Sequence, residues 1–303
     1  MTGTPSAELV EELRGEHRVQ LNIPDLDQGF RLKTRSMLSV AVPMMYDSFT
    51  RHVDVAALRA AGFGSVVTHA EFERRPGPLA VGADLDVTVV TRHAELSGWG
   101  LGHRPSRLGF ECRYTFASRP GTGDPFRYRE TVSDEPFVCG TGRLLLTLVR
   151  RDGPPGQRIV AEPLPQTRHL AVHVLEPGHP GAAELAEPPE GGREAAAGER
   201  AGVFGLQHTD TNQIVFTGEY LGLLEDHLTV LAAQAGLPVA NQATDRVTLA
   251  FRNPFRAGDA FTVRGRLWRD GDRGTAVLGV YGDGADKPNV LGRLHLDGPT
   301  AST

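Results

Sequence analysis

The sequence repeats one order of predicted elements, and this repeat restricts the possible folds more than any other feature. In the first half, a helix-like stretch precedes four segments in which apolar and polar residues alternate. The second half shows the same order, with a helix-like stretch at residues 219–236 and alternating segments from residue 246 onward. Such alternation is typical of half-buried antiparallel strands. The sequence therefore predicts two related units, each with one helix followed by four or more antiparallel strands.

Two local features support this repeat. Pro78 and Gly82 enclose three residues, as do Pro254 and Gly258, and each turn leads into another strand-like segment. The second helix has an apolar stripe at spacings of three and four residues. This stripe consists of Leu221, Leu224, Leu228 and Leu231.

Between the halves, residues 176–200 are rich in Pro, Gly, Ala and Glu and contain almost no large apolar side chains. Such a segment cannot bury enough surface to offset the entropy lost on ordering, so we expect a flexible linker. The expected division is an N-terminal extension at 1–28, a first unit at 29–175, the linker at 176–201 and a second unit at 202–298.

Composition excludes several classes of protein. The 303 residues carry a net charge of −5, which argues against a general preference for nucleic acid. The two cysteines, Cys112 and Cys139, are too few for a disulfide scaffold or a thiolate zinc site and suit a reducing cytosol. No apolar run approaches the roughly 20 residues that cross a bilayer. We therefore expect a cytoplasmic protein without a bound metal and without a membrane or nucleic-acid partner.

The residues that lead into the second helix carry a recognisable pattern. Residues 209–220 read TDTNQIVFTGEY and resemble the helix-entry signature of acyl-carrier-protein thioesterases of the hotdog fold. The positions that match are Asp210, Asn212, Gln213, Val215 and Tyr220. The resemblance implies an α+β fold in which each long helix is wrapped by an antiparallel sheet, with two hotdog units fused as a pseudo-dimer. It also implies a substrate held as a thioester on an acyl carrier protein or coenzyme A.

The two halves depart from this signature in different ways. In the second half Ile214 and Phe216 replace the histidine and an asparagine of the family pattern. In the first half a sister version keeps His52 and has Asp54 at the asparagine position. We therefore expect the chemistry in the first half, and we expect residues 53–61 and 218–235 to be the two sheet-embraced helices.

The resemblance gives the polar residues near the first helix a possible catalytic role. His52 or Asp54 could activate water beside backbone N–H groups at a helix N-terminus, which stabilise an oxyanion. Asp54 could equally be a simple helix cap with His52 as its polar neighbour. Tyr46 and Asp47 precede the same helix, and Tyr46 could donate a hydrogen bond to an acyl carbonyl or act as a nucleophile. Alternatively, Tyr46 is a core residue whose hydroxyl is satisfied locally.

Further candidates lie in the second half and in a Gly-rich loop. Asp210 and Asn212 could face the site across the pseudo-dimer interface, or they are ordinary turn and cap residues. Glu225 stands where the family sometimes places a carboxylate base, or it belongs to a solvated helix face. Arg104 and Arg107 could contact the phosphate of a phosphopantetheine arm, or they are solvated surface residues.

The function expected from the resemblance is thioesterase-type hydrolysis in polyketide or fatty-acid-like specialised metabolism, without a resident cofactor. A non-hydrolytic enzyme of the same fold is the main alternative: an acyltransferase/decarboxylase using Tyr46, a dehydratase or a cyclase. A catalytically silent acyl-binding module is the third. Because a fused pair already buries the contact between its units, a monomer or a homodimer is expected.

Overall fold

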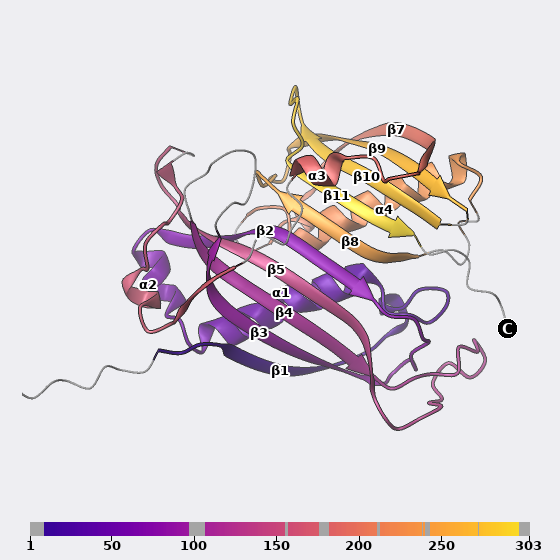
Figure 1. Ribbon diagram of the computed structural model, residues 1–303, viewed down its shortest axis with the longest axis horizontal. Helices are drawn as coiled ribbons and strands as arrows, with labels where there is room; N and C mark the ends of the chain where they lie inside the picture. The colour runs from indigo at the N-terminus through magenta and orange to yellow at the C-terminus, as the bar shows by residue number, and fades with distance from the viewer. Residues whose placement is uncertain are drawn as a thin grey trace, which may run out of the picture.

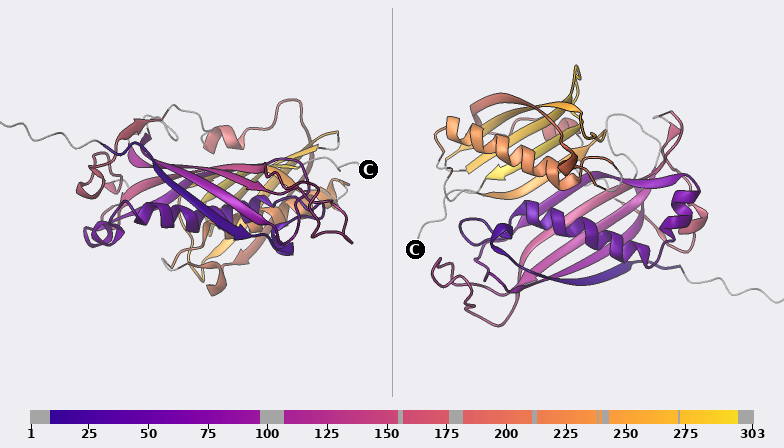
Figure 2. Two further views of the ribbon diagram at one scale, coloured as in Figure 1. Left: turned by 90° about the horizontal axis from the view of Figure 1, so that it is seen from below. Right: turned by 180° about the vertical axis from the view of Figure 1, so that it is seen from behind.

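One sheet, antiparallel except for a short parallel strand at residues 172–174, runs through both halves of the chain and carries two long helices on the same face (Figure 1, Figure 2). The computed structural model describes residues 9–96, 107–154, 157–175, 182–210, 213–237, 239, 243–271 and 273–296. In this described part of the chain, none of the helices combines the length and apolar character needed to span a membrane.

The first unit contains α1 and five long strands. Their spatial order in the sheet is β1-β3-β4-β5-β2. The elements are β1 (Leu13–Gln20), α1 (Thr34–Thr50), β2 (Phe63–Arg74), β3 (Asp84–Leu96), β4 (Arg107–Ser118) and β5 (Phe137–Arg150). Short elements complete the unit: η1 (Ile23–Asp25), α2 (Val55–Ala60), η3 (Pro165–Thr167) and β6 (Val172–Val174), which pairs with β3.

The second unit repeats this plan in mirrored sheet order, β8-β11-β10-β9-β7. Its elements are α3 (Ala182–Ala186), β7 (Arg193–Val203), η4 (Leu206–His208), α4 (Thr217–Gln234), β8 (Thr244–Phe251), β9 (Ala260–Asp270), β10 (Arg273–Gly282) and β11 (Val290–Leu296). The predicted pair of units, each with a helix and antiparallel strands, is thus confirmed.

The units join edge to edge through β2 and β8. These strands pair antiparallel from His69 opposite Ala250 to Glu73 opposite Arg246. Phe72 and Val247, directly opposite each other at this seam, are fully buried. One continuous hydrophobic core includes side chains of both units, and α1 contacts α4. The two units therefore pack against each other and are not joined by a linker alone.

The repeated turn noted in the sequence has the same role in both units. Gly82 and Gly258 have positive φ angles of 85° and 90°, a conformation that glycine adopts at little cost. The Gly82 N–H donates to Leu21 O, and the Gly258 N–H donates to Phe204 O. Each turn thereby holds the chain segment that leads toward the central helix of its own unit.

The expected first central helix at residues 53–61 is wrong. The helix that lies along the first unit's sheet is α1, whereas α2 is a six-residue helix. The apolar side chains Met37, Leu38, Ala41 and Met45 recur at helical spacing and are buried against the sheet, while Pro43 lies on the exposed side. Burial of this stripe outweighs the helix-breaking tendency of Pro43.

The expected flexible linker is wrong for residues 193–201, which belong to β7. This strand pairs with β9 along the outer edge of the sheet. Its Gly and Ala residues allow α4 to lie close, and the Gly198 carbonyl is 3.2 Å from His227 Nε2. Residues 176–181 of that prediction lie outside the described residues. The expected N-terminal extension likewise contains β1, which pairs with β3 along its whole length.

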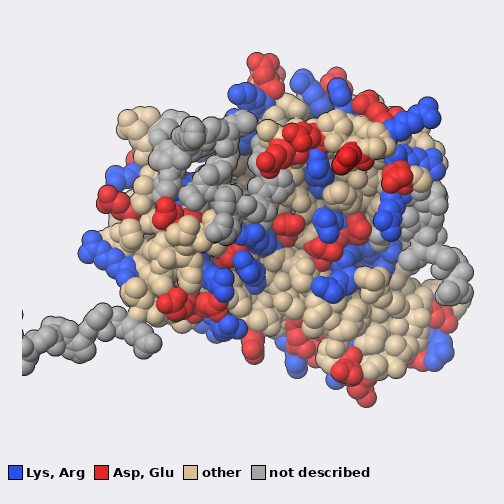
Figure 3. All heavy atoms as spheres, viewed as in Figure 1, with Lys and Arg blue, Asp and Glu red and all other residues tan. Residues whose placement is uncertain are grey.

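The outer face of the sheet carries charges of both signs. Figure 3 shows acidic and basic side chains interspersed on this face. Arg246 pairs with Glu73 across the seam, and the buried Glu111 carboxylate pairs with Arg113 and Arg143. The described residues on this face therefore form no extended patch of one sign.

The seam can be tested by truncating its central aromatic side chain. We expect Phe72→Ala to lower the free energy of unfolding by about 3–5 kcal/mol, because it empties a fully enclosed site. The matched control is Phe126→Ala, whose side chain is 94% exposed and which should change stability by less than about 0.5 kcal/mol. Urea unfolding measures both, and equal effects would contradict the enclosure of Phe72 at the seam.

Candidate functional site

Each unit begins its central helix with the same short loop. In unit 1 η1 is followed by a bridge between Leu26 and Leu32, and in unit 2 η4 is followed by a bridge between Thr209 and Val215. Phe30 has a φ of 59° and its counterpart Gln213 a φ of 62°. The helices then start at Thr34 and Thr217. We call these loops, which run from η1 to Thr34 and from η4 to Thr217, the helix-entry loops. The loop of each unit lies beside the central helix of the other unit.

The larger of the two resulting pockets, the Glu225 pocket, is a cavity of about 340 Å³ between the helix-entry loop of unit 1 and α4 of unit 2. Its wall combines polar and apolar side chains. The polar lining residues are Asp27, Gln28, Lys33, Thr34, Glu225, Thr229 and Thr244. The apolar ones are Leu26, Leu228, Ala232, Val239, Ala243 and Leu296.

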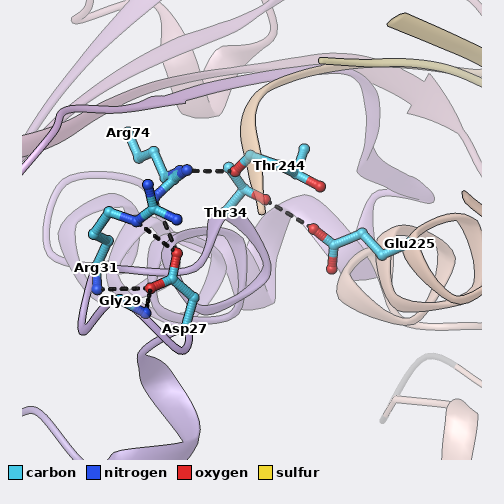
Figure 4. A network of polar contacts seen from close by, with 7 residues as sticks. All are labelled: Asp27, Gly29, Arg31, Thr34, Arg74, Glu225 and Thr244. Atoms are coloured by element: carbon cyan, nitrogen blue, oxygen red, sulfur yellow. Dashed lines mark hydrogen bonds and ion pairs between the residues drawn. The ribbon is translucent and has the colours of Figure 1, made fainter. Parts of the chain in front are cut away.

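Glu225 is largely enclosed, with part of its surface open to this pocket. Thr34 Oγ1 donates to Glu225 Oε1 at 3.0 Å (Figure 4). The Thr244 side chain is a second hydrogen-bond partner of the Glu225 carboxyl. Burial raises the pKa of the Glu225 carboxyl, and this effect exceeds the lowering by those hydroxyls and by the nearby Arg35 and Lys33. A carboxyl with a raised pKa in a pocket is suited to accept and return a proton near neutral pH.

A second carboxylate beside this pocket has a structural role. Asp27 Oδ1 accepts from the N–H groups of Gly29 and Arg31, and Asp27 Oδ2 accepts from Arg31 Nε at 2.9 Å and Arg74 Nη1 at 3.1 Å (Figure 4). Arg74 Nε donates to Thr244 O at 3.1 Å. This network ties the helix-entry loop of unit 1 to β2 and to the start of β8. Because its oxygens are occupied by these donors, Asp27 is poorly placed to act as a base.

The smaller pocket, the Tyr46 pocket, is a cavity of about 130 Å³ between α1 and the helix-entry loop of unit 2. Its lining includes Val42, Met45 and Tyr46 of α1 and residues 65–68 of β2. Unit 2 contributes Asp210, Phe216 and Thr217 among others. Burial, assisted by the Asp210 carboxylate, raises the pKa of the Tyr46 hydroxyl, which also hydrogen-bonds to Ser65.

The pseudo-symmetry makes the two pockets counterparts with different chemistry. Val42 stands at the position of α1 that Glu225 occupies in α4, and Phe216 stands where the other loop has Lys33. Each pocket retains an aspartate at the start of its loop and a threonine at the start of its helix. Of the two cavities, therefore, only the Glu225 pocket has a carboxyl group on the central helix.

The structure does not bring His52 and Asp54 to either pocket. Both side chains are exposed beyond the C-terminal end of α1, and Asp54 Oδ1 caps α2 by accepting from the Ala57 N–H at 2.9 Å. Asp47 is exposed and pairs with Arg51 at 2.6 Å. The placement of these residues at the entry of a central helix is wrong, because that helix is α1 and they follow its end. Tyr46 and Asp210, in contrast, do share a pocket across the unit boundary.

The remaining candidates are placed as follows. Arg107 begins β4, away from the lining of both pockets, whereas Arg104 and Asn212 lie outside the described residues. The sequence reasoning missed Thr34 and Thr244 as partners of Glu225. Aligning DQGFRLKT at residues 27–34 with DTNQIVFT at residues 210–217 would have identified Thr34, because both stretches run from an aspartate to the first residue of a helix. Thr244 has no comparable sequence signal.

No protein-family model matches the sequence, and no curated protein matches it at a significant level. Solved structures do resemble the fold. A Lactobacillus plantarum protein assigned as an oleoyl thioesterase superposes with a TM-score of 0.63 at 14% identity, covering 96% of this chain and 98% of that one. The 12:0-ACP thioesterase from Umbellularia californica gives 0.61 at 11% identity, covering 94% of each chain.

An acyl-ACP thioesterase from Bacteroides thetaiotaomicron superposes with a TM-score of 0.57 at 11% identity, covering 94% of this chain and 98% of the other. At such identities the similarity establishes the fold alone. The chain has the α+β fold of two fused hotdog units, and the fold expected from the helix-entry signature is confirmed.

The raised pKa of Glu225 predicts a pH-dependent stability effect. Because the folded protein favours the protonated carboxyl, this favourable contribution is complete at low pH and is lost as pH rises through the raised pKa. We therefore expect Glu225→Gln, which keeps the shape without the charge, to raise the melting temperature at neutral pH. The gain should shrink toward about pH 4, where carboxyl groups are normally half protonated. A gain that is independent of pH would contradict the raised pKa.

Proposed function

We propose that the protein hydrolyses an acyl thioester in the Glu225 pocket. The observation that carries this proposal is an enclosed carboxyl group with a raised pKa, held by two hydroxyl groups in a cavity formed by both units. The cavity is large enough for a small acyl group together with part of a pantetheine arm. The solved structures of this fold that are thioesterases support the same class of substrate.

In the proposed reaction, Glu225 acts as a general base on water. The water oxygen attacks the thioester carbonyl carbon while the Glu225 carboxylate takes its proton. The start of α1, at Thr34 on the pocket wall, offers backbone N–H groups that have no acceptor within the helix and can stabilise the oxyanion. When the carbon–sulfur bond breaks, the thiolate takes the proton from Glu225. The products are the free acid and the thiol.

The carrier in this proposal is an acyl carrier protein or coenzyme A. Both present the acyl group on a pantetheine thioester, which is the chemistry implied by the helix-entry signature. The setting in polyketide or fatty-acid-like specialised metabolism is a hypothesis that rests on the resemblance alone.

Acyl transfer through a Tyr46 nucleophile is the competing reaction. A tyrosine attacks more readily when its pKa is lowered, because the phenolate is the nucleophilic form. In the Tyr46 pocket, burial and the Asp210 carboxylate raise the pKa of this hydroxyl. The chemistry of the Tyr46 pocket therefore favours hydrogen bonding by a neutral phenol, and hydrolysis in the Glu225 pocket is preferred.

Substitution of Glu225 tests the site directly. We expect Glu225→Gln to lower kcat for acyl-pantetheine hydrolysis by about 10²–10⁴-fold while the fold is retained, as is usual for loss of a positioned acid–base group. Tyr46→Phe and His52→Ala serve as matched controls and should each keep more than about a tenth of the activity. Thiol release from a panel of acyl-pantetheine thioesters measures the activity of each variant. Activity that survives Glu225→Gln but is lost in Tyr46→Phe would assign the reaction to the other pocket.

The pH profile provides a second test. Since the ionised carboxylate is the base, kcat/KM should rise with pH through the pKa of Glu225 in the free enzyme, which is raised above its ordinary value of 4.5. Removing the hydrogen bond with Thr34→Val should move this limb further toward high pH, because that hydroxyl lowers the pKa. A limb that stays in place in Thr34→Val would show that another group limits the rate.

A further inference from the structure

The Tyr46 pocket is not used by the proposed hydrolysis, although it occupies the pseudo-equivalent place in the fold. Its central helix contributes Val42 where the other pocket has the Glu225 carboxyl, and its entry loop contributes Phe216 where the other has Lys33. Two charged groups are thus replaced by apolar ones. Such a wall favours an apolar ligand over the polar thioester chemistry of the counterpart.

The size of this pocket limits what it can hold. The cavity of about 130 Å³ is close to the roughly 150 Å³ of an engineered protein cavity that binds benzene. A separate cavity of only about 10 Å³, which shares Met45 and Tyr46 with this pocket, reaches Phe110 and Cys112 between α1 and the sheet of unit 1. Phe49 and Phe110, packed edge to face with ring centres 4.6 Å apart, line this small cavity. The pocket therefore fits one six-membered ring or a chain of similar volume.

Two polar side chains from different units face this apolar space. Tyr46 of α1 provides a hydroxyl that stays protonated, and Asp210 of the helix-entry loop lies close enough to influence it. A neutral phenol can donate a hydrogen bond, and a carboxylate can accept several. A ligand hydroxyl can therefore accept a hydrogen bond from Tyr46 while it donates one to Asp210.

An anionic group on a ligand would be repelled by one side chain of this pocket and attracted by another. A carboxylate would approach Asp210, whose like charge disfavours it in a partly buried site. Arg252, exposed on the wall of the same pocket, could attract an anion only toward the solvent side. The interior therefore favours a neutral hydroxyl over an anionic group.

We propose that the Tyr46 pocket is a second, non-catalytic ligand site that binds a small phenol, with the ring among Val42, Met45 and Phe216 and the hydroxyl between Tyr46 and Asp210. The site is independent of the reaction in the Glu225 pocket. It is built from both units, so its occupancy also bridges them.

A binding experiment with the full chain tests this proposal without a substrate. 4-Fluorophenol is titrated with the protein and followed by ¹⁹F NMR, with fluorobenzene and 4-fluorobenzoate as the comparison probes. We expect 4-fluorophenol to bind at least about 3-fold more tightly than fluorobenzene, the affinity change that one hydrogen bond commonly brings. 4-Fluorobenzoate should bind more weakly than 4-fluorophenol.

Variants assign the binding to the pocket. Tyr46→Phe and Asp210→Asn should each weaken 4-fluorophenol binding by about 3- to 10-fold and leave fluorobenzene binding nearly unchanged. Val42→Phe should abolish binding of both probes by filling the cavity, whereas Glu225→Gln should not affect either. Circular dichroism verifies that each variant is folded. Ser65→Ala, which removes the hydroxyl partner of Tyr46, is a milder second change to the polar side of the pocket.

Three results would overturn the proposal. Equal binding of fluorobenzene and 4-fluorophenol would remove the role of the polar pair, and tighter binding of 4-fluorobenzoate would identify an acid site governed by Arg252. Loss of 4-fluorophenol binding in Glu225→Gln but not in Val42→Phe would place the probe in the other pocket. Because no step in this experiment involves hydrolysis, a failure here leaves the proposed function untouched, and the reverse also holds.

Discussion

The antiparallel pairing of β2 with β8 is the contact from which the arrangement of both pockets follows. It joins two five-stranded sheets edge to edge, so that α1 and α4 lie on one face and each helix-entry loop meets the other unit. Backbone hydrogen bonds set the register, and the buried pair of Phe72 and Val247 makes a slip by one residue costly, since it would turn apolar side chains outward. Neither pocket could form within a single unit.

The two pockets show how a duplicated interface can diverge. Enclosing Glu225 is unfavourable for its charged form, and the structure offsets part of that cost with the Thr34 and Thr244 hydroxyls. The neighbouring Asp27 is neutralised by Arg31 and Arg74, which also fix the loop that carries Thr34. In the counterpart loop Ile214 stands where the first loop has Arg31, and the pocket beside it is lined by Phe216 and the Tyr46 phenol.

Much of the architecture was readable from local patterns. The leucine stripe of α4 and the turns at Gly82 and Gly258 depend on short-range spacing and φ preferences, which the sequence shows directly. Two elements were misassigned because tertiary packing outweighed local tendency. Pro43 lies inside α1 and lowers the helix tendency of that stretch, but burial of the helical stripe against the sheet stabilises the helix. The Gly and Ala residues of β7 have the composition of a linker, but pairing with β9 makes them a strand.

For the candidate site too, some features followed from the sequence and others only from tertiary packing. The sequence by itself determined that the chain contains two related units, that the second has a helix-entry loop with a changed signature, and that Glu225 and Tyr46 deserve consideration. Only the tertiary structure decided which residues meet. Glu225 accepts a hydrogen bond from Thr34, which is distant in the sequence, and Tyr46 and Asp210 line the same pocket. His52 and Asp54 remain at the surface. The reason is physical: the environment that shifts a pKa or encloses a cavity is made by strand pairing between units, and such long-range contacts leave little trace in local residue spacing.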